Sequence, residues 1–277
     1  MKSMKSTYLF IFLLMSYISI AQDLTVNSGG VITIPQDSYV FVGSNFSNTA
    51  GTVTLNSDSD EFSSLLVSGS ASGDITYNRY VNIVGTGEWD LIGAPVSNMA
   101  FSSLITDANI ATNGSFYAVG AYDNSADTWT NATNATTGNL ELGQGYQMAT
   151  IGGGTLSFIG AIASGDQSVT ITNNNAENSG AGMRWNLIAN PFASYLNGNS
   201  NADETNNFLT FNTTAENDVI DDNFEAIYGW KADGTGYAIY NNASTATYIA
   251  PGQGFFVAAA GSGGDQTITF TKAMQTV

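Results

Sequence analysis

The chain has 277 residues without cysteine or histidine, and its 6 basic and 23 acidic residues give a formal net charge of −17. The missing residue types exclude disulfide bonds, thiolate or imidazole metal sites, cysteine nucleophiles and histidine-based triads. The acidic balance also argues against nucleic acid and anionic lipid as partners, because phosphate binding needs clusters of lysine and arginine.

Residues 1–21 have the pattern of a secretory signal peptide. Lys2 and Lys5 precede an apolar run, and small residues stand before Gln22, where we expect cleavage. Removal of the two lysines leaves 4 basic residues, so the mature charge is 4 − 23 = −19. No later run has the roughly 20 apolar residues that span a membrane. The sequence therefore predicts a secreted or cell-surface protein that meets a secretion machinery during export.

Residues 22–80 alternate short β-prone runs with turns rich in glycine, asparagine, serine and aspartate. The runs lack a 3.6-residue period, which excludes helices. Even spacing favours a short segment of β-solenoid, and an ordinary meander is the alternative.

The remainder of the chain contains an internal repeat. The segment EWDLIGAPVSN at 88–98 corresponds to RWNLIANPFAS at 184–194, and YDNSADTW at 122–129 to WKADGTGY at 230–237. A Gly-Gln-Gly triplet at 143–145 recurs at 252–254, and LSFIGAI at 156–162 matches ITFTKAM at 268–274. Landmarks that repeat in one order indicate a duplicated module with loop insertions.

We predict two tandem antiparallel β-sandwich modules, jelly-roll-like, over residues 81–177 and 178–277. A single larger pseudo-symmetric sandwich is the alternative. Short helical turns are expected only at 98–107 and 202–209. The strand-like run at 165–175 has no counterpart after 268–274, so the second copy is expected to be truncated.

Trp89 and Trp185 begin the most apolar strand of each copy, so both are predicted to lie in the core. The Gly-Gln-Gly triplets lack the lysine and helix of a phosphate loop, and we interpret them as tight strand entries.

The protein is predicted not to be an enzyme and to need no cofactor. A carboxylate-dependent glycoside hydrolase is the catalytic alternative, since it needs only two acids. Glu88 and Asp90 flank the first tryptophan, but Arg184 and Asn186 replace them in the second copy. Calcium is the metal that loop oxygens could bind, at 58–61 or 218–222, although a solvated acidic turn explains both segments.

A ligand site would use the loops between strands. Aromatic faces pack on the C–H surfaces of sugar rings, and nearby carboxylates accept hydrogen bonds from hydroxyl groups. Because the −19 field repels acidic chains, a neutral or cationic polysaccharide fits best. The alternative is that these aromatics only pack across their hairpins. The candidate residues are Tyr122, Trp129, Trp230, Tyr237, Tyr240, Asp123, Asp127 and Asp233.

The chain resembles a family of surface and secreted proteins from Bacteroidota. The resemblance rests on Trp-x-Leu-Ile-x-x-Pro at 185–191, Pro-Gly-Gln-Gly-Phe-Phe-Val at 251–257 and the segment at 63–82. It implies export by the type IX route and a role in adhesion or polysaccharide binding; the family's C-terminal sorting domain is not recognisable here. We therefore expect a cell-surface adhesin-like or glycan-binding module, with a structural stalk as the alternative.

Overall fold

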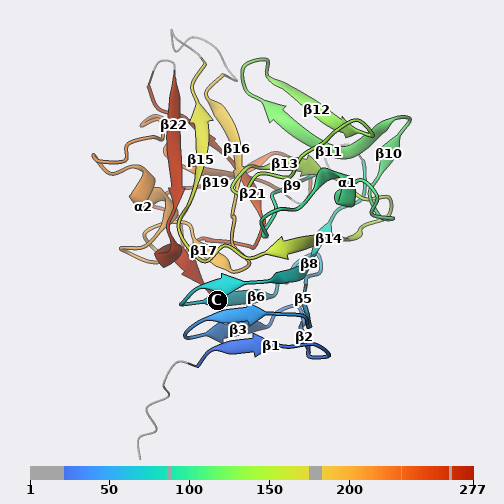
Figure 1. Ribbon diagram of the computed structural model, residues 1–277. Helices are drawn as coiled ribbons and strands as arrows, with labels where there is room; N and C mark the ends of the chain where they lie inside the picture. Colours follow the sequence, from blue (N-terminus) through green and yellow to red (C-terminus); the bar gives the residue numbers. More distant parts are fainter. Residues whose placement is uncertain (1–21, 86–88, 175–182, 232, 262–263) are drawn as a thin grey trace, which may run out of the picture.

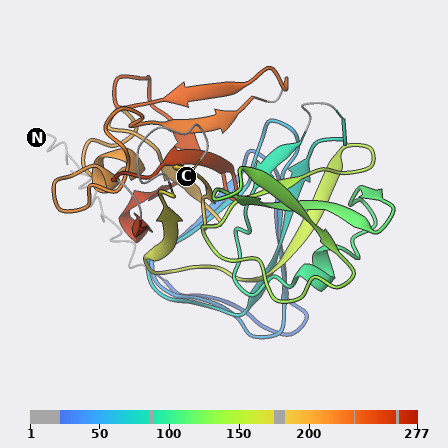
Figure 2. The same ribbon diagram turned by 90° about the horizontal axis from the view of Figure 1, so that it is seen from above.

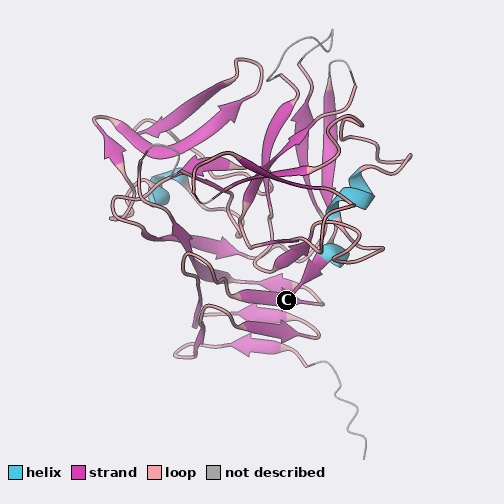
Figure 3. Cartoon of the chain, turned by 180° about the vertical axis from the view of Figure 1, so that it is seen from behind, coloured by secondary structure: helices cyan, strands magenta, loops and turns pink. Residues whose placement is uncertain are grey.

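The computed structural model describes residues 22–85, 89–174, 183–231, 233–261 and 264–277. The predicted signal peptide lies outside these residues. Strands make up nearly all of the regular structure (Figure 3). This confirms the predicted all-β class. Among the described residues the helices are α1 (Phe101–Leu104), α2 (Phe208–Asn212) and the 3-10 turn η1 (Lys272–Met274). The first lies where a helical turn was expected, and α2 begins six residues later than predicted.

The N-terminal segment is a β-solenoid, as the even spacing predicted. Its strands stack in parallel as three columns, β1–β4–β7, β2–β5–β8 and β3–β6. Figure 2 looks along the stack, where successive blue turns overlie one another. The strands are β1 (Leu24–Val26), β2 (Val31–Ile34), β3 (Tyr39–Val42), β4 (Phe46–Asn48), β5 (Thr52–Asn56), β6 (Ser64–Val67), β7 (Ala71–Ser72) and β8 (Asp74–Val81).

Asparagine side chains join neighbouring turns of the solenoid. The Asn78 amide donates to Asn56 Oδ1 at 2.9 Å, one turn below. Asn48 Nδ2 donates to the Asp74 carbonyl at 2.7 Å. Inside the stack, alternate apolar residues such as Leu55 and Tyr77 are fully buried. Side-chain amides thus satisfy the turns while the period-2 pattern fills the interior.

β8 belongs to the solenoid and to the first module together. It pairs in parallel with β5 and antiparallel with β14, so one sheet runs β14–β8–β5–β2 (Figure 1). The other first-module strands are β9 (Asp90–Ile92), β10 (Thr112–Asn113), β11 (Phe116–Asp123), β12 (Thr128–Thr133), β13 (Tyr146–Met148) and β14 (Gly154–Ala161). The two parts share one hydrophobic core.

The second module has its own core between two sheets and α2. A four-stranded sheet of order β16–β21–β18–β19 packs on the β15–β22 ladder, and β20–β17–β23 forms a small third sheet. The strands are β15 (Gln167–Thr172), β16 (Trp185–Ala189), β17 (Tyr195–Asn197), β18 (Ile227–Trp230), β19 (Tyr237–Tyr240), β20 (Tyr248–Ile249), β21 (Gly254–Ala258), β22 (Asp265–Phe270) and β23 (Gln275–Thr276).

Strand order and register both repeat between the copies. The sheet β9–β13–β11–β12 corresponds to β16–β21–β18–β19. In the first copy Gly120 pairs with Gln147. The residues 108 and 109 positions later, Tyr228 and Phe256, pair in the same way in the second copy. In the first copy Tyr122 pairs with Trp129, and in the second Trp230 pairs with Tyr237. The duplication predicted from sequence is therefore present in the hydrogen-bond ladders.

The predicted boundary at 177/178 needs correction. β15 pairs over its whole length with β22 of the second copy, from Gln167↔Phe270 to Thr172↔Asp265. It is the counterpart of β8, which pairs with β14 in the same way. The repeated strands therefore run from β8 to β14 and from β15 to β22, and β23 completes the third sheet of the second module. The strand expected to be extra in the first copy is the first strand of the second, so the comparison of strands gives no support to a truncated second copy.

The repeated motifs make reciprocal contacts between the copies. The Gly93 amide donates to the Gly252 carbonyl at 2.8 Å, and the Ala189 amide donates to the Gly143 carbonyl at 2.8 Å. These are equivalent bonds, because each joins one copy's Trp-x-Leu-Ile strand to the other copy's Gly-Gln-Gly triplet. The triplets thus serve as the contact between modules, which explains why they recur with so little variation.

The second module also rests on the solenoid. Lys272 Nζ donates to the carbonyls of Ser68 and Gly69, both at 2.6 Å, and the Leu65 amide donates to the Ala193 carbonyl at 2.7 Å. Solenoid and both modules therefore contact one another pairwise, with the stacked solenoid turns below the two modules in Figure 1.

Candidate functional site

A groove of about 510 Å³ opens where the two modules meet. It lies on the outer face of the β16–β21–β18–β19 sheet, the face turned away from the second core. The β11–β12 hairpin of the first module adds one wall. Eight residues line the groove, and we call it the aromatic groove: Tyr122, Asp127, Trp129, Trp185, Tyr228, Tyr237, Ile239 and Phe256.

Strand alternation explains why so many rings share this face. In β21, Phe255 and Val257 point into the second core, so Phe256 between them points outward. Tyr228 pairs with both Phe256 and Ile239, which places the three on one face. The outer face is therefore fixed by the register of the sheet.

Phe256 is the centre of the aromatic contacts. Its ring lies edge-on to Tyr122 with centroids 5.1 Å apart, to Tyr237 at 5.8 Å and to Trp129 at 6.3 Å. Trp185 contacts Tyr228 at 4.6 Å. Rings from both modules are thus locked together by edge-to-face packing, which gives the groove a preformed shape.

The polar groups of the groove are few. The Tyr122 hydroxyl donates to Asp127 Oδ1 at 2.7 Å. Burial is the largest cause that raises the pKa of Tyr122 above its ordinary value, and the nearby Asp127 raises it further. The same two causes raise the pKa of Tyr237. Both phenols are therefore neutral near pH 7 and can donate or accept hydrogen bonds. Trp129 and Tyr237 keep 38% and 44% of their surface exposed, so their faces are available to a ligand.

The structure brings four of the eight predicted site residues together in the groove: Tyr122, Trp129, Tyr237 and Asp127. Trp230 contacts Tyr237 at 5.0 Å but lines a separate polar pocket. Tyr240 lies on the other side of β19, beside Tyr248.

The two remaining candidates, Asp123 and Asp233, hold their own turns. Asp123 Oδ1 accepts from the Ser125 amide at 2.9 Å and hydroxyl at 2.7 Å, and Asp233 Oδ1 accepts from the Thr235 amide and hydroxyl. These bonds lower the pKa of both carboxyls. Both carboxylates therefore hold their turns through Oδ1, and their role as sugar acceptors stays a prediction.

Four residues that line the groove were not among the predicted site residues: Trp185, Tyr228, Ile239 and Phe256. Trp185 and Trp89 were expected in the core, but both are only partly buried, and Trp185 instead lines the groove. The alternation of side chains along a strand could have identified the last of these residues. In Gly254–Ala258, an inward Phe255 requires an outward Phe256. The run is apolar on both faces, so composition alone could not separate the core face from the groove face.

Of the two acidic segments considered for calcium, 58–61 is a turn, whereas in 218–222 Ile220 forms a β-bridge with Ala259 and Asp221 is buried. Asp58 Oδ1 accepts from the amides of Asp60 and Glu61, at 3.0 and 2.8 Å. Within the described residues no group of three or more acidic side chains is placed to hold a metal ion.

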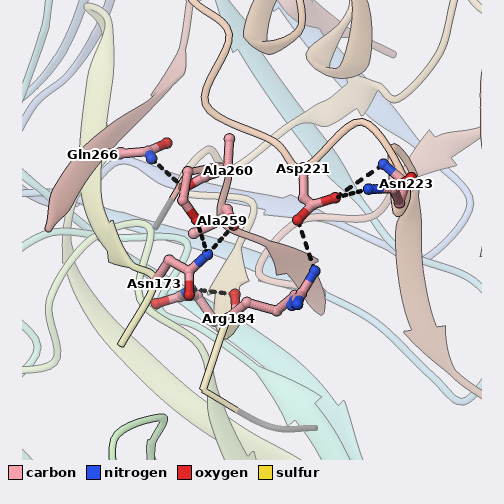
Figure 4. Close-up of polar contacts among 9 residues, drawn as sticks. Asn173, Arg184, Asp221, Asn223, Ala259, Ala260 and Gln266 are labelled. Carbon is pink, nitrogen blue, oxygen red and sulfur yellow. Dashed lines mark hydrogen bonds and ion pairs between the residues drawn. The ribbon is translucent and has the colours of Figure 1, made fainter. Parts of the chain in front are cut away.

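A second polar cluster, shown in Figure 4, is structural. Arg184 Nη1 lies 2.8 Å from Asp221 Oδ2, and both residues are buried. The other carboxylate oxygen accepts from the Asn223 amide at 2.9 Å, and Asn173 Nδ2 donates to the Ala259 carbonyl at 3.2 Å. Because the carboxylate is satisfied from within the chain, the cluster fastens the end of β21 and offers no ligand site.

Comparisons with known proteins give a family and no activity. In the ranges that the structure describes, no helix has the length and apolar character needed to cross a membrane. No curated protein and no solved structure matches the chain significantly. Residues 7–277 match the family described as Domain of unknown function (DUF8693), and because the match covers nearly the whole sequence, the chain belongs to that family.

Proposed function

We propose that this protein is a non-catalytic, exported surface protein that binds a neutral polysaccharide in the aromatic groove. The observation that carries the proposal is the gathering of Tyr122, Trp129, Trp185 and Tyr237 in one open groove of about 510 Å³. Several flat apolar faces beside a few hydroxyl groups suit a sugar chain, whose rings have apolar C–H faces and polar edges.

The charge of the chain selects the class of polysaccharide. With a formal charge of −17 over the full sequence, the field repels uronic acids and sulfated chains. Asp127, the one carboxylate among the described residues that line the groove, adds a local negative charge. A neutral chain meets no such repulsion and finds an acceptor in this carboxylate.

A binding role also fits the groove better than hydrolysis. A glycoside hydrolase places two carboxyl groups about 5–9.5 Å apart on either side of the scissile bond. Asp127 has no second acid opposite it among the described groove residues. We therefore place the protein with binding modules rather than with glycoside hydrolases.

The test is a glycan array followed by calorimetry with the best neutral polysaccharide. Trp129→Ala and Tyr237→Ala should each weaken binding by about tenfold or more, since a lost stacking face costs roughly 1.4 kcal/mol or more. Tyr240→Ala is the matched control, because Tyr240 is exposed on the same strand as Tyr237 but outside the groove. Equal binding by all three variants would refute the groove as the site.

The second candidate function is a structural stalk. Its support is the continuous sheet β14–β8–β5–β2, which joins solenoid and first module through one core. A stalk would bind no glycan on the array and would keep its shape under load.

Export is part of the proposal. We propose that residues 1–21 are removed by signal peptidase and that the protein then reaches the cell surface or medium, by the type IX route that the Bacteroidota resemblance implies. Mass spectrometry of the exported chain should find Gln22 as the first residue, and a chain that still carries residues 1–21 would contradict this.

A further inference from the structure

A second, polar pocket lies where the solenoid, the first module and the second module meet. Its volume is about 260 Å³, and we call it the junction pocket. It is separate from the aromatic groove and differs from it in chemistry, because charged and amide groups line it together with one tryptophan. The residues that matter here are Phe62, Arg79, Asn82, Asp90, Trp230 and Gln253.

Arg79 brings a positive charge to this pocket. Only 6% of its surface is exposed. Nε donates to the Pro251 carbonyl at 3.1 Å, Nη1 donates to the Tyr80 carbonyl at 2.9 Å, and the guanidinium lies 4.1 Å from the centre of the Phe62 ring. Among the described residues no group accepts a hydrogen bond from Nη2, and no carboxylate lies within 4.0 Å of the guanidinium. Burying a cation without a carboxylate partner usually lowers the stability of the fold by several kcal/mol.

Asp90 supplies acceptors on the other side of the pocket. Its two carboxylate oxygens accept from the amide and the side chain of Asn82, at 2.8 and 3.0 Å. Each oxygen can accept a second hydrogen bond. Burial raises the pKa of Asp90, and the opposing effects come from Asn82 and Arg79. The pocket therefore offers a free donor and free acceptors.

The second copy of the module shows what the fold itself needs at these positions. Leu156 and Ile268 are equivalent residues of the repeat. The first pairs with Arg79 and the second with Val169, so a valine stands in the second copy where the first has the arginine. Likewise Asn186 stands where the first copy has Asp90. A buried valine satisfies the position without an unpaired charge. The repeated architecture thus does not require a charge at this position.

The pocket that corresponds to this one in the second copy is already satisfied from within. It is lined by Tyr122, Gln144 and Asn186, among others. Asn186 Oδ1 accepts from the Thr172 amide and from Asn124 Nδ2, and Asn186 Nδ2 donates to the carbonyls of Thr172 and Arg184. All four hydrogen bonds of this amide are made inside the protein. At this position, therefore, the first copy's Asp90 keeps acceptor capacity for a ligand, and the second copy's Asn186 does not.

We infer that the junction pocket binds one uncharged sugar residue, with its ring against Trp230 and its hydroxyl groups bonded to the Arg79 guanidinium and the Asp90 carboxylate. Arg79 faces two carboxylates among the residues that line the pocket, Asp60 and Asp90, so the pocket does not favour an acidic sugar. A cavity below the roughly 300–1,000 Å³ of drug-sized sites suits a single sugar unit rather than a chain.

This inference rests on the proposed function, because the pocket would hold one unit of the polysaccharide whose other units occupy the aromatic groove. Trp230 and Tyr237 pack on each other with centroids 5.0 Å apart, and the first lines the pocket while the second lines the groove. The two sites are therefore adjacent along one sheet face, and affinity should rise with chain length.

The test uses saturation-transfer NMR with the methyl glycosides of glucose, galactose, mannose and xylose, and calorimetry with oligosaccharides of increasing length. The variant Arg79→Val/Asp90→Asn gives the first copy the residues of the second, so it should keep the fold, which thermal unfolding checks. It should lose methyl glycoside binding by about tenfold or more. Trp129→Ala should keep methyl glycoside binding but lose the gain in affinity with chain length.

The outcomes separate the two proposals. Normal methyl glycoside binding by Arg79→Val/Asp90→Asn, or no binding of any methyl glycoside to the wild type, overturns the junction pocket and leaves the groove untouched. Unchanged oligosaccharide binding by Trp129→Ala, with the pocket variant impaired, overturns the groove instead. Tighter binding of methyl glucuronide than of methyl glucoside overturns the assignment to an uncharged sugar, since it would show Arg79 to be an anion site.

Discussion

The two modules have the same strand order but differ on their outer faces. Where the second copy has Tyr228, Phe256 and Ile239, the first has Gly120, Gln147 and Asn131 at the same places in the register. Gln147 and Asn131 bond to each other at 3.0 Å. At these three positions one outer face is thus apolar and the other is polar or lacks a side chain.

This difference separates what builds the fold from what serves the ligand. The residues that recur, such as the Gly-Gln-Gly triplets, lie at the contact between modules, where a side chain would meet backbone. The residues that diverge lie on the outer face, where the core sets no requirement. A duplicated fold has therefore kept its architecture and specialised one surface in the second copy.

The largest loss of stability is expected when the ion pair that fastens the second copy is removed. Arg184→Met leaves the Asp221 carboxylate buried without its partner, so stability should fall by about 3–5 kcal/mol in chemical unfolding. Arg184→Met/Asp221→Leu should recover most of the loss. An Arg184→Met protein as stable as the wild type would show that the pair does not hold the sheet end.

The contact between copies is tested by adding one methyl group to each triplet. A Cβ on Gly254 would lie 2.7 Å from the Leu91 carbonyl carbon, and one on Gly145 would lie 2.9 Å from the Ile188 carbonyl oxygen. Because backbone cannot move aside cheaply, each alanine variant should lose about 3 kcal/mol. Gly165→Ala is the matched control, since it has open space and should change stability by less than about 0.5 kcal/mol. Equal effects at all three positions would contradict the reciprocal contact.

Trp89 and Trp185 are the same motif residue on the outer faces of the two copies. Truncating either to alanine should cost about 2 kcal/mol, below the roughly 3–5 kcal/mol of a fully buried tryptophan, since both are only partly buried. Trp185→Ala alone should also weaken binding of the neutral polysaccharide, because only Trp185 lines the aromatic groove. Equal binding losses in the two variants would argue against a site on the outer face of the second copy's sheet.

The duplication could be predicted from sequence because repeated landmarks survive in order, and the solenoid because its turns are local and evenly spaced. The boundary between copies could not. β15 follows β14 directly in the chain, but its partner β22 lies about a hundred residues further on. Strand pairing over such distances leaves no local pattern.

Half of the candidate site was predicted for a related reason. Tyr122, Trp129, Tyr237 and Asp127 stand beside hairpin turns, which composition reveals. Phe256 stands in a strand that is buried on both faces, where no alternation of polar and apolar residues distinguishes the side that the other module covers. The groove exists only after the modules have met.

The smallest expected effect concerns the hydrogen bond between Tyr122 and Asp127, which the second copy lacks because Trp230 occupies the equivalent position. Tyr122→Phe keeps the ring against Phe256 and removes only the hydroxyl, so it should cost about 1 kcal/mol. The pKa of Tyr122 is raised in the folded protein, so the protonated phenol stabilises the fold below the ordinary tyrosine pKa of about 10, and this contribution is lost as the pH rises above it. Unfolding of the wild type should therefore become easier between about pH 9 and 11, and less so for Tyr122→Phe. Urea titrations of both proteins across this range measure the difference, and parallel pH profiles would show that the Tyr122 hydroxyl does not contribute to the stability of the groove wall.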